Sequence, residues 1–358
     1  MEKPPKKKWW RWGVNRWFIL LFIIGSVVTA YTLGIKPVQP HIQLPAEKLS
    51  CTPILELPAP FGDNPPAHCL SEGGGGHATT TPVTGLYLTN TLVAMLIADA
   101  ILLLLGFGYY RFSKTGSLIP RGFSGGLEAL LEVIYNLTQT TAGKWTKVVF
   151  PWFATITLLV LTANWMSLIP GVDSIGILEK AEHGYSLQKI LGLTTIVNTP
   201  AGEVVHAGEG FTIVPFVRVL STDLNFTVAL ALIAVIMVQV IGIRAQGRVY
   251  FTKFWNTKTL FSKPMFGVID FGVGLLELVS EISKILSFAF RLFGNVFAGA
   301  VLLFVIGTLV PVFAQTGFLM LEFFVGMIQA IVFGMLTMTF MAQATQGHGG
   351  EHKEEAQA

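Results

Sequence analysis

Charged residues are scarce in this chain of 358 residues. Asp, Glu, Lys and Arg together make up 13% of it, whereas hydrophobic residues make up 52%. Soluble domains carry about 25% charged residues, so the composition excludes an ordinary soluble domain and indicates an integral membrane protein. The formal net charge of +3 is also too small to indicate a nucleic-acid partner.

Sequence motifs of enzymes are missing as well. The chain has no glycine-rich nucleotide loop and no arrangement of residues typical of a catalytic triad, so we expect no catalytic chemistry on the chain itself. Its histidines all lie outside the apolar stretches, where solvation is their ordinary state, and none indicates a metal site or a cofactor. They are His41, His68, His77, His183, His206, His348 and His352.

Long apolar stretches recur along the chain, and a helix needs about 20 such residues to cross a bilayer. We therefore predict an all-α, polytopic membrane protein with about six membrane helices. The last two are longer than one perpendicular crossing requires, so we expect them to be tilted or to extend out of the membrane. The predicted spans are residues 17–35, 92–109, 148–169, 226–243, 266–309 and 318–343.

Lysine and arginine alternate between the segments that flank these spans. Counted from the N-terminus, the successive segments carry 6, 2, 5, 3, 5 and 0 of them. Because cytoplasmic segments are richer in positive charge, the alternation predicts a cytoplasmic N-terminus and, after six crossings, a cytoplasmic C-terminus. In a bacterium the chain would then be a multi-pass protein of the cell (inner) membrane.

The chain divides into four parts by composition. Residues 1–35 are a basic N-terminus with an extra apolar segment, and residues 36–88 form an extracytoplasmic linker rich in proline and glycine. Residues 89–345 hold the other spans, and residues 346–358 are a polar tail. The first segment is either a retained helix or a signal peptide cleaved after Ala30. The linker holds Cys51 and Cys69, which either form a disulfide in the exported loop or stay unpaired thiols.

Segment 122–142 is not predicted to cross the membrane. It mixes Glu128, Glu132 and Asn136 with regularly spaced leucine, valine and isoleucine. This pattern is typical of an amphipathic helix, which we expect to lie at the inner membrane interface. No internal repeat is found, which weakens the hypothesis of a transporter built from two inverted halves.

The most informative residue is Arg291, which lies within the apolar pattern of segment 266–309. A permanent charge at membrane depth costs from about 3 to more than 10 kcal/mol, and arginine cannot lose its proton. At 100° per residue, a series of polar residues shares one helix face with Arg291, and that face must be turned to protein or water. The series comprises Glu277, Ser280, Lys284, Ser287, Arg291 and Asn295.

The other spans add further polar candidates. Glu322 and Gln329 are seven residues apart in the last span and so share one face, and Asn164 closes the third span. Each candidate has a structural alternative. Arg291 could extend to the headgroups, Lys284 could pair with Glu281, and Glu322 could line a wall. Gln329 could be a simple hydrogen-bonding group between helices, and Asn164 could brace a helix end.

Several of these stretches resemble subunit a of the bacterial F-type ATP synthase (the ATPase A chain family). The resemblance covers roughly residues 85–345, and the part around Arg291 is the most specific. It rests on Leu276-Glu277-Leu-Val-Ser280 through Ser283-Lys284 to Ser287, Arg291-Leu-Phe-Gly-Asn295 and Ala298-Gly299. It extends to Asn164-Trp-Met-Ser-Leu-Ile-Pro170, Ser221-Thr-Asp223-Leu-Asn225-Phe-Thr and Gln329-Ala330.

The resemblance implies a stator of the ATP synthase membrane sector that supports ATP synthesis by hydrogen ion transport. Its implied partners are the rotor ring of subunit c, the peripheral-stalk subunit b, the rest of the complex, membrane lipid and protons. It also implies that two half-channels reach the ring, and that Arg291 drives deprotonation of the ring carboxylate and blocks leak. Asn295, Gln329, Ser287, Asn164, Glu322, Glu277 and Lys284 would line the proton pathway.

The chain departs from the best-known bacterial pattern at three positions. Ala300 stands where that pattern has a carboxylate, Glu322 where it has a histidine, and Ser167 where it has an acid. We infer that one acid of the proton uptake path has moved from one helix to the facing helix. Two other classes remain possible, a proton-coupled secondary transporter and a membrane scaffold without transport, and the ring would decide between H⁺ and Na⁺.

Overall fold

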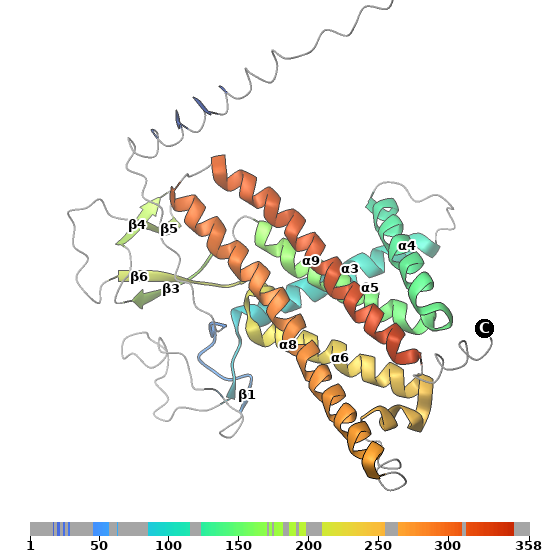
Figure 1. Cartoon of the computed structure of the whole chain (residues 1–358). Helices are drawn as coiled ribbons and strands as arrows, with labels where there is room; N and C mark the ends of the chain where they lie inside the picture. The colour runs from blue at the N-terminus through green and yellow to red at the C-terminus, as the bar shows by residue number, and fades with distance from the viewer. Residues whose placement is uncertain are drawn as a thin grey trace, which may run out of the picture.

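The computed structural model describes the helical part of the chain almost completely (Figure 1). The residues it describes are 46–56, 63, 85–114, 123–169, 172–173, 175–181, 186–190, 193–197, 210–254, 264–309 and 313–346, with positions 17, 20, 21, 24, 25 and 28. Those six positions are helical, but the rest of the predicted first span lies outside the described residues. So do Cys69 and the tail from residue 347 onward.

Helices dominate the described chain, as the sequence predicted. Five helical stretches in this part of the chain are long and apolar enough to cross a membrane, and each overlaps one of the five predicted spans after the first. The helices are α3 (Asn90–Lys114), α4 (Phe123–Ala142), α5 (Thr146–Trp165), α6 (Leu224–Gln246), α8 (Pro264–Leu309) and α9 (Phe313–Thr345).

The last two helices are the longest, with 46 residues in α8 and 33 in α9. At 1.5 Å per residue, α8 is about 69 Å long, more than twice a hydrocarbon core of about 30 Å. Figure 1 shows α8 and α9 running diagonally across one side of the molecule, in front of α5 and α6. The prediction that both helices exceed a perpendicular crossing is therefore confirmed in their length.

The main core lies where α5, α6, α8 and α9 meet. Val160 of α5, Ala231 and Ala234 of α6, Leu292 of α8 and Phe333 of α9 are all at most 1% exposed. Because alanine side chains are small, Ala231 and Ala234 let α6 approach the buried face of α8 closely. This core buries one face of α8 and fixes which face remains open.

Helix α4 has the amphipathic periodicity that the sequence predicted. Ile134, Thr138 and Ala142 are buried at four-residue spacing, whereas Val133 and Tyr135 are exposed. Its buried side packs against α5 and α9, together with Phe153 and Met341. Contacts within the protein therefore account for the buried stripe of this helix.

Short strands occur in the segments between the helices, a feature that the sequence analysis did not predict. They form three antiparallel pairs among the described residues, β1 with β2, β3 with β6 and β4 with β5. The pairs β3–β6 and β4–β5 lie at the end of the bundle where α8 ends and α9 begins (Figure 1). The strands are β1 (Leu55–Glu56), β2 (Gly85–Leu86), β3 (Gly176–Ala181), β4 (Ser186–Ile190), β5 (Leu193–Val197) and β6 (Gly210–Pro215).

One buried carboxylate joins the starts of two helices. Asp223 is the N-cap of α6, where its Oδ1 accepts from the backbone N–H of Asn225 at 2.9 Å. Its Oδ2 accepts from the Thr91 hydroxyl in the first turn of α3 at 3.0 Å. Caps of this kind stabilise a helix by about 1 kcal/mol, and this one also holds α3 against α6.

The described part of the linker before α3 has defined structure. There β1 pairs with β2, and Cys51 is disulfide-bonded. The disulfide that the sequence allowed is therefore confirmed at Cys51.

Candidate functional site

The candidate site lies along the antiparallel contact between α8 and α9. Near its centre, the Asn295 amide nitrogen donates to Oε1 of Gln329 at 2.7 Å. The rings of Phe288 and Phe333 then meet with centroids 5.1 Å apart. Gln329 is only 4% exposed, so this amide pair fixes the register of the two helices inside the packed interface.

Arg291 lies one helical turn before Asn295 on α8. Its Nη2 donates to the Ser287 hydroxyl at 3.4 Å, a weak contact to its own helix. Ala289 and Leu292, its neighbours toward the core, are fully buried, while Phe290 is 54% exposed. No Asp or Glu among the described residues forms an ion pair with Arg291. The guanidinium thus stands at the edge of the bundle without a counter-ion from this part of the chain.

The polar stripe that contains Arg291 follows the same edge. Ser287 and Asn295 are exposed, and Glu277, Lys284 and Arg291 are half-buried, whereas the adjacent face of α8 is fully buried in the core. The stripe therefore lies beside the buried face of α8, at the boundary between the core and the open side of the helix.

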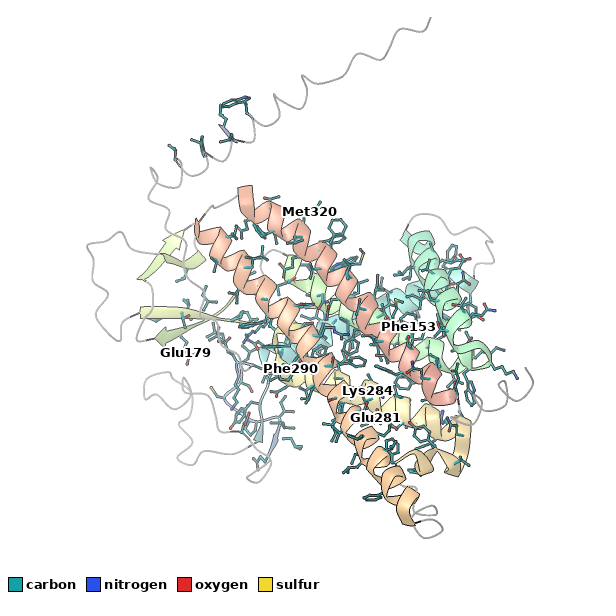
Figure 2. All side chains as sticks on the ribbon, viewed as in Figure 1. Phe153, Glu179, Glu281, Lys284, Phe290 and Met320 are labelled. Carbon is teal, nitrogen blue, oxygen red and sulfur yellow. The ribbon has the colours of Figure 1, made fainter. Side chains whose placement is uncertain are left out.

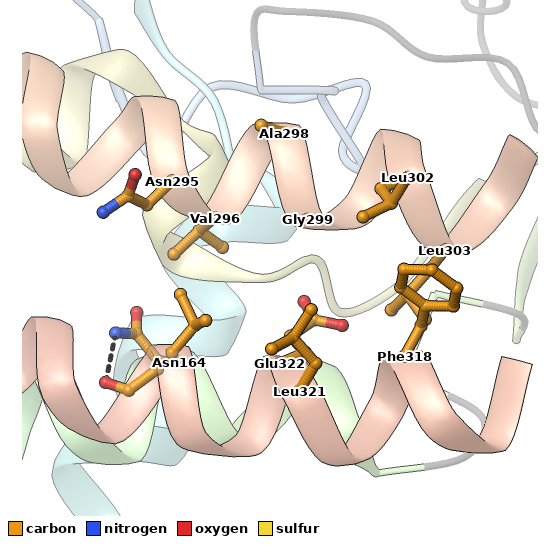
Figure 3. A pocket seen from close by; sticks show the side chains of 12 residues that line it. Asn164, Asn295, Val296, Ala298, Gly299, Leu302, Leu303, Phe318, Leu321 and Glu322 are labelled. Atoms are coloured by element: carbon orange, nitrogen blue, oxygen red, sulfur yellow. Dashed lines mark hydrogen bonds between the residues drawn. The ribbon is translucent and has the colours of Figure 1, made fainter. Parts of the chain in front are cut away.

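A cavity of about 200 Å³ opens between α8 and α9, beyond Asn295 toward the end of α8 (Figure 3). Its one acidic side chain is Glu322, which points from α9 toward α8. Both carboxylate oxygens of Glu322 are buried and have no hydrogen-bond partner among the described residues. The nearby Ser167 hydroxyl donates to the Asn164 carbonyl oxygen at 2.7 Å instead.

The residue that faces Glu322 across the cavity is Gly299. A β-carbon on Gly299 would lie 3.5 Å from Glu322 Oε1. Ala300, which the resemblance implied would face Glu322, is exposed and does not line the cavity. An acid on α9 thus fits here because α8 carries no side chain at the opposing position.

Asn164 borders the same cavity and also braces three elements. Its Nδ2 donates to the backbone carbonyl of Gly326 on α9 at 3.1 Å, and its Oδ1 accepts from the Ser221 hydroxyl at 2.7 Å. Ser221 belongs to the short helix η3 (Leu220–Thr222), which precedes α6. Asn164 is 3% exposed. Asn164 therefore braces a helix end, as the structural alternative expected, and it also lines the cavity.

A second polar cluster lies toward the start of α8 (Figure 2). Lys284 Nζ donates to Glu281 Oε1 at 2.9 Å and lies 4.8 Å from the ring centroid of Phe340 on α9. Glu281 is 7% exposed. Tyr250 of the short helix η4 (Gly247–Lys253) is also buried, and its hydroxyl donates to Gln239 Oε1 at 2.6 Å. Burial, then the charges of Glu281 and Glu277, raise the pKa of Tyr250 to about 12.

Charged groups also gather at the other end of the bundle, where the strands lie. Burial raises the pKa of the Glu47 carboxyl, and the Arg218 guanidinium opposes that rise. The Glu47 carboxylate also accepts from the Asn90 amide at 3.1 Å, at the start of α3. Burial also raises the pKa of the Asp173 carboxyl, and Arg218 opposes that rise too. The Asp173 carboxylate lies close enough for its charge to reach Glu322. Ionisable groups therefore continue from the cavity toward that end of the molecule.

Comparison with known proteins agrees with this arrangement. The chain matches the ATP synthase A chain family over residues 92–342, which include all of the α8 and α9 site. It belongs to that family. Members of this family are part of the ATP synthase complex. This chain is accordingly a subunit a with several helices long and apolar enough to span a membrane.

Curated relatives named ATP synthase subunit a come from several bacteria. The chain is 28% identical over 242 residues to the protein of Campylobacter jejuni (strain 81-176), covering 66% of this chain and 84% of the relative. It is 26% identical over 248 residues to that of Moorella thermoacetica, covering 69% and 88%. It is 28% identical over 283 residues to that of Mycobacterium ulcerans, covering 78% and 95%.

Within this subunit a fold, the sequence-predicted residues separate into three places. Asn295 and Gln329 pair at the centre, Glu322 and Asn164 border the cavity, and Glu277 and Lys284 lie toward the start of α8. Gln329 reaches Asn295, and no hydrogen bond joins it to Arg291. The sequence did not reveal that Glu281 and Tyr250 are buried, or that Gly299 faces Glu322 across the cavity. The three-residue spacing of Glu281 and Lys284 was the available signal for the first of these.

Proposed function

We propose that this chain is the stationary, non-catalytic subunit that carries protons between the two aqueous phases and a rotor ring of subunit c. Subunit b of the peripheral stalk would hold it in place, and ATP chemistry would occur on other subunits. The observation that carries the proposal is Arg291, a permanent charge on a membrane helix that has no acidic partner within the described chain. Such a charge calls for a partner from outside the chain.

A membrane carboxylate of the ring is the partner that suits Arg291. At about 4 Å and an effective dielectric constant of about 20, the gross attraction is about 4 kcal/mol. This attraction favours the ionised carboxylate and so drives release of its proton. The polar stripe supports the proposal, because Ser287, Arg291 and Asn295 lie along the side of α8 that the core leaves open.

Two half-channels that do not join would complete the path. The cavity with Glu322 supports an outer half-channel that ends near Asn295, and the cluster of Glu277, Glu281 and Lys284 supports an inner one. Arg291 lies between them along α8. A proton that crosses a potential of 100 mV releases about 2.3 kcal/mol, which would drive rotation. A fixed positive charge between the half-channels would oppose a direct proton leak.

The experiment replaces Arg291 in the intact complex. We expect Arg291→Ala to abolish ATP synthesis driven by an imposed proton gradient in membrane vesicles, while the complex still assembles. Arg291→Lys should fail too, because an ammonium lacks the planar fork of a guanidinium and can lose its proton. Arg244→Ala is the matched control, since Arg244 is an exposed arginine in the last turn of α6. Normal synthesis by either Arg291 variant would refute the proposal.

A further inference from the structure

Glu281 is a buried acid to which the function proposed above assigns no step of its own. It is 7% exposed and lies ten positions before Arg291, which is about 15 Å along the helix axis. At 100° per residue it is turned about 80° from Arg291 around α8, toward the packed interior. It therefore lies beside the open polar stripe and inside the protein.

Groups on two other elements surround this acid. Lys284 pairs with it at 2.9 Å and in turn lies over the Phe340 ring of α9. From the side of η4, Tyr250 lies close enough for the Glu281 charge to act on it. Tyr250 reaches this place because its ring packs directly on Gly242 of α6, where any β-carbon would collide with it. The acid is thus buried on α8 and paired with a lysine that contacts α9, and Tyr250 of η4 lies within range of its charge.

The polar residues near Glu281 follow one another at regular spacing along α8. Ser287 and Lys284 lie between Arg291 and Glu281 along α8, and Glu277 lies one turn farther toward the start of the helix. Neighbouring members are three or four residues apart, a rise of about 5 to 6 Å. Ordered water can link polar groups that are too far apart for a direct hydrogen bond. The series therefore leads from the open face beside Arg291 into the enclosed cluster and on toward the start of α8.

Burial of an ion pair is by itself weak support for a structural role. Taking two charges out of water costs several kcal/mol per ion, and apolar residues of similar size often stabilise a protein as well or better. A buried carboxylate beside a row of polar groups can, however, accept a proton and pass it on. Glu281 has this arrangement at a depth where a proton leaving the ring would need an acceptor.

We propose that Glu281 is the proton-relay residue of the inner half-channel. In this step a proton from a neutral ring carboxyl passes through water beside Ser287 and Lys284 to the Glu281 carboxylate. The ring group becomes a carboxylate and Glu281 becomes a carboxylic acid. Glu281 then gives the proton to water beside Glu277, which restores its charge and its pair with Lys284. The inference rests on the proposed stator function and adds a residue to its inner path.

The test uses the intact complex in vesicles and follows ATP synthesis under an imposed gradient and ATP-driven proton pumping. We expect Glu281→Gln to slow both by about tenfold, since a positioned acid–base group speeds a proton transfer by about a hundredfold or more. Glu281→Asp keeps the acid and should retain most of the rate. Glu132→Gln is the control, because Glu132 is an exposed acid on α4.

A double variant separates a relay from a structural pair. If Glu281 only balances the charge of Lys284, then Glu281→Gln with Lys284→Met should restore the parent rate, because no buried charge is left unpaired. If Glu281 relays protons, the double variant should stay as slow as Glu281→Gln. Parent rates in the single or the double variant would overturn the proposal. So would loss of assembly in both, which would assign Glu281 to structure.

The Arg291→Ala variant, tested alongside, keeps the two proposals apart. If Arg291→Ala abolishes synthesis and Glu281→Gln leaves it unchanged, the stator function stands and the relay fails. If Arg291→Ala leaves synthesis unchanged, the stator function itself fails.

Discussion

Glu322 of α9 lies directly opposite Gly299 of α8, and a β-carbon on Gly299 would come within 3.5 Å of the carboxylate (Figure 3). That distance is ordinary van der Waals contact, so alanine fits at position 299 without displacing Glu322. Larger side chains would extend into the cavity of about 200 Å³ that Glu322 borders. The size of residue 299 therefore controls how much space the acid has.

Filling that space should block proton uptake. We predict that Gly299→Leu slows gradient-driven ATP synthesis severalfold, because the added side chain occupies the space where water would reach Glu322. Gly299→Ala, the matched control, should stay near the parent rate. Rates would be measured in vesicles at equal amounts of assembled complex. Equal rates for Gly299→Leu and the parent would mean that protons do not pass through this cavity.

The acid itself gives the second prediction. Glu322→Gln keeps the shape and polarity of the side chain but removes its ability to exchange a proton. We predict that the variant assembles normally and takes up protons severalfold more slowly across the pH range. Glu322→Asp should be much closer to the parent. If proton uptake by Glu322→Gln matches the parent at every pH, Glu322 is a wall residue and the outer path runs elsewhere.

Packing of α9 against α5 gives a stability prediction. A β-carbon on Gly334 would collide with the Thr157 hydroxyl and lie 2.8 Å from Cε2 of the buried Phe153 ring. Overpacking of this kind costs about 1 to 3 kcal/mol, so Gly334→Ala should lower the midpoint of thermal unfolding of the purified complex. Gly106→Ala on α3 is the control, because a β-carbon there meets nothing within 4 Å. An unchanged midpoint for Gly334→Ala would show that α9 can shift freely on α5.

Topology can be tested at Cys51, which is disulfide-bonded. The alternation of Lys and Arg places this residue outside the cytoplasm, where a disulfide persists. We predict that, after reduction, a membrane-impermeant maleimide labels Cys51 from the extracytoplasmic side. N-terminal sequencing of the mature chain separates a retained first helix from a signal cleaved after Ala30. Labelling from the cytoplasmic side alone would reverse the orientation and, with it, the sides of the two half-channels.

The helices could be predicted from sequence because the bilayer imposes a simple length and composition on them. The predicted span 148–169 corresponds within a few residues to α5 with the short helix η2 (Met166–Leu168), and the predicted span 266–309 corresponds to α8. The amphipathic pattern of α4 was equally clear, because its buried residues recur at four-residue spacing. The short strands gave no such signal, because two to six residues carry too little periodicity.

By itself, the sequence determined the membrane class, the helical elements and the position of Arg291 in the middle of a span. These follow from local pattern, since a charge among apolar neighbours is visible without knowing the fold. Only the tertiary structure decided which residues meet across helices. Gln329 pairs with Asn295, Gly299 faces Glu322, and Tyr250 packs on Gly242. Such contacts depend on the register of α8 against α9 and on the path of η4, which are set by packing between distant segments.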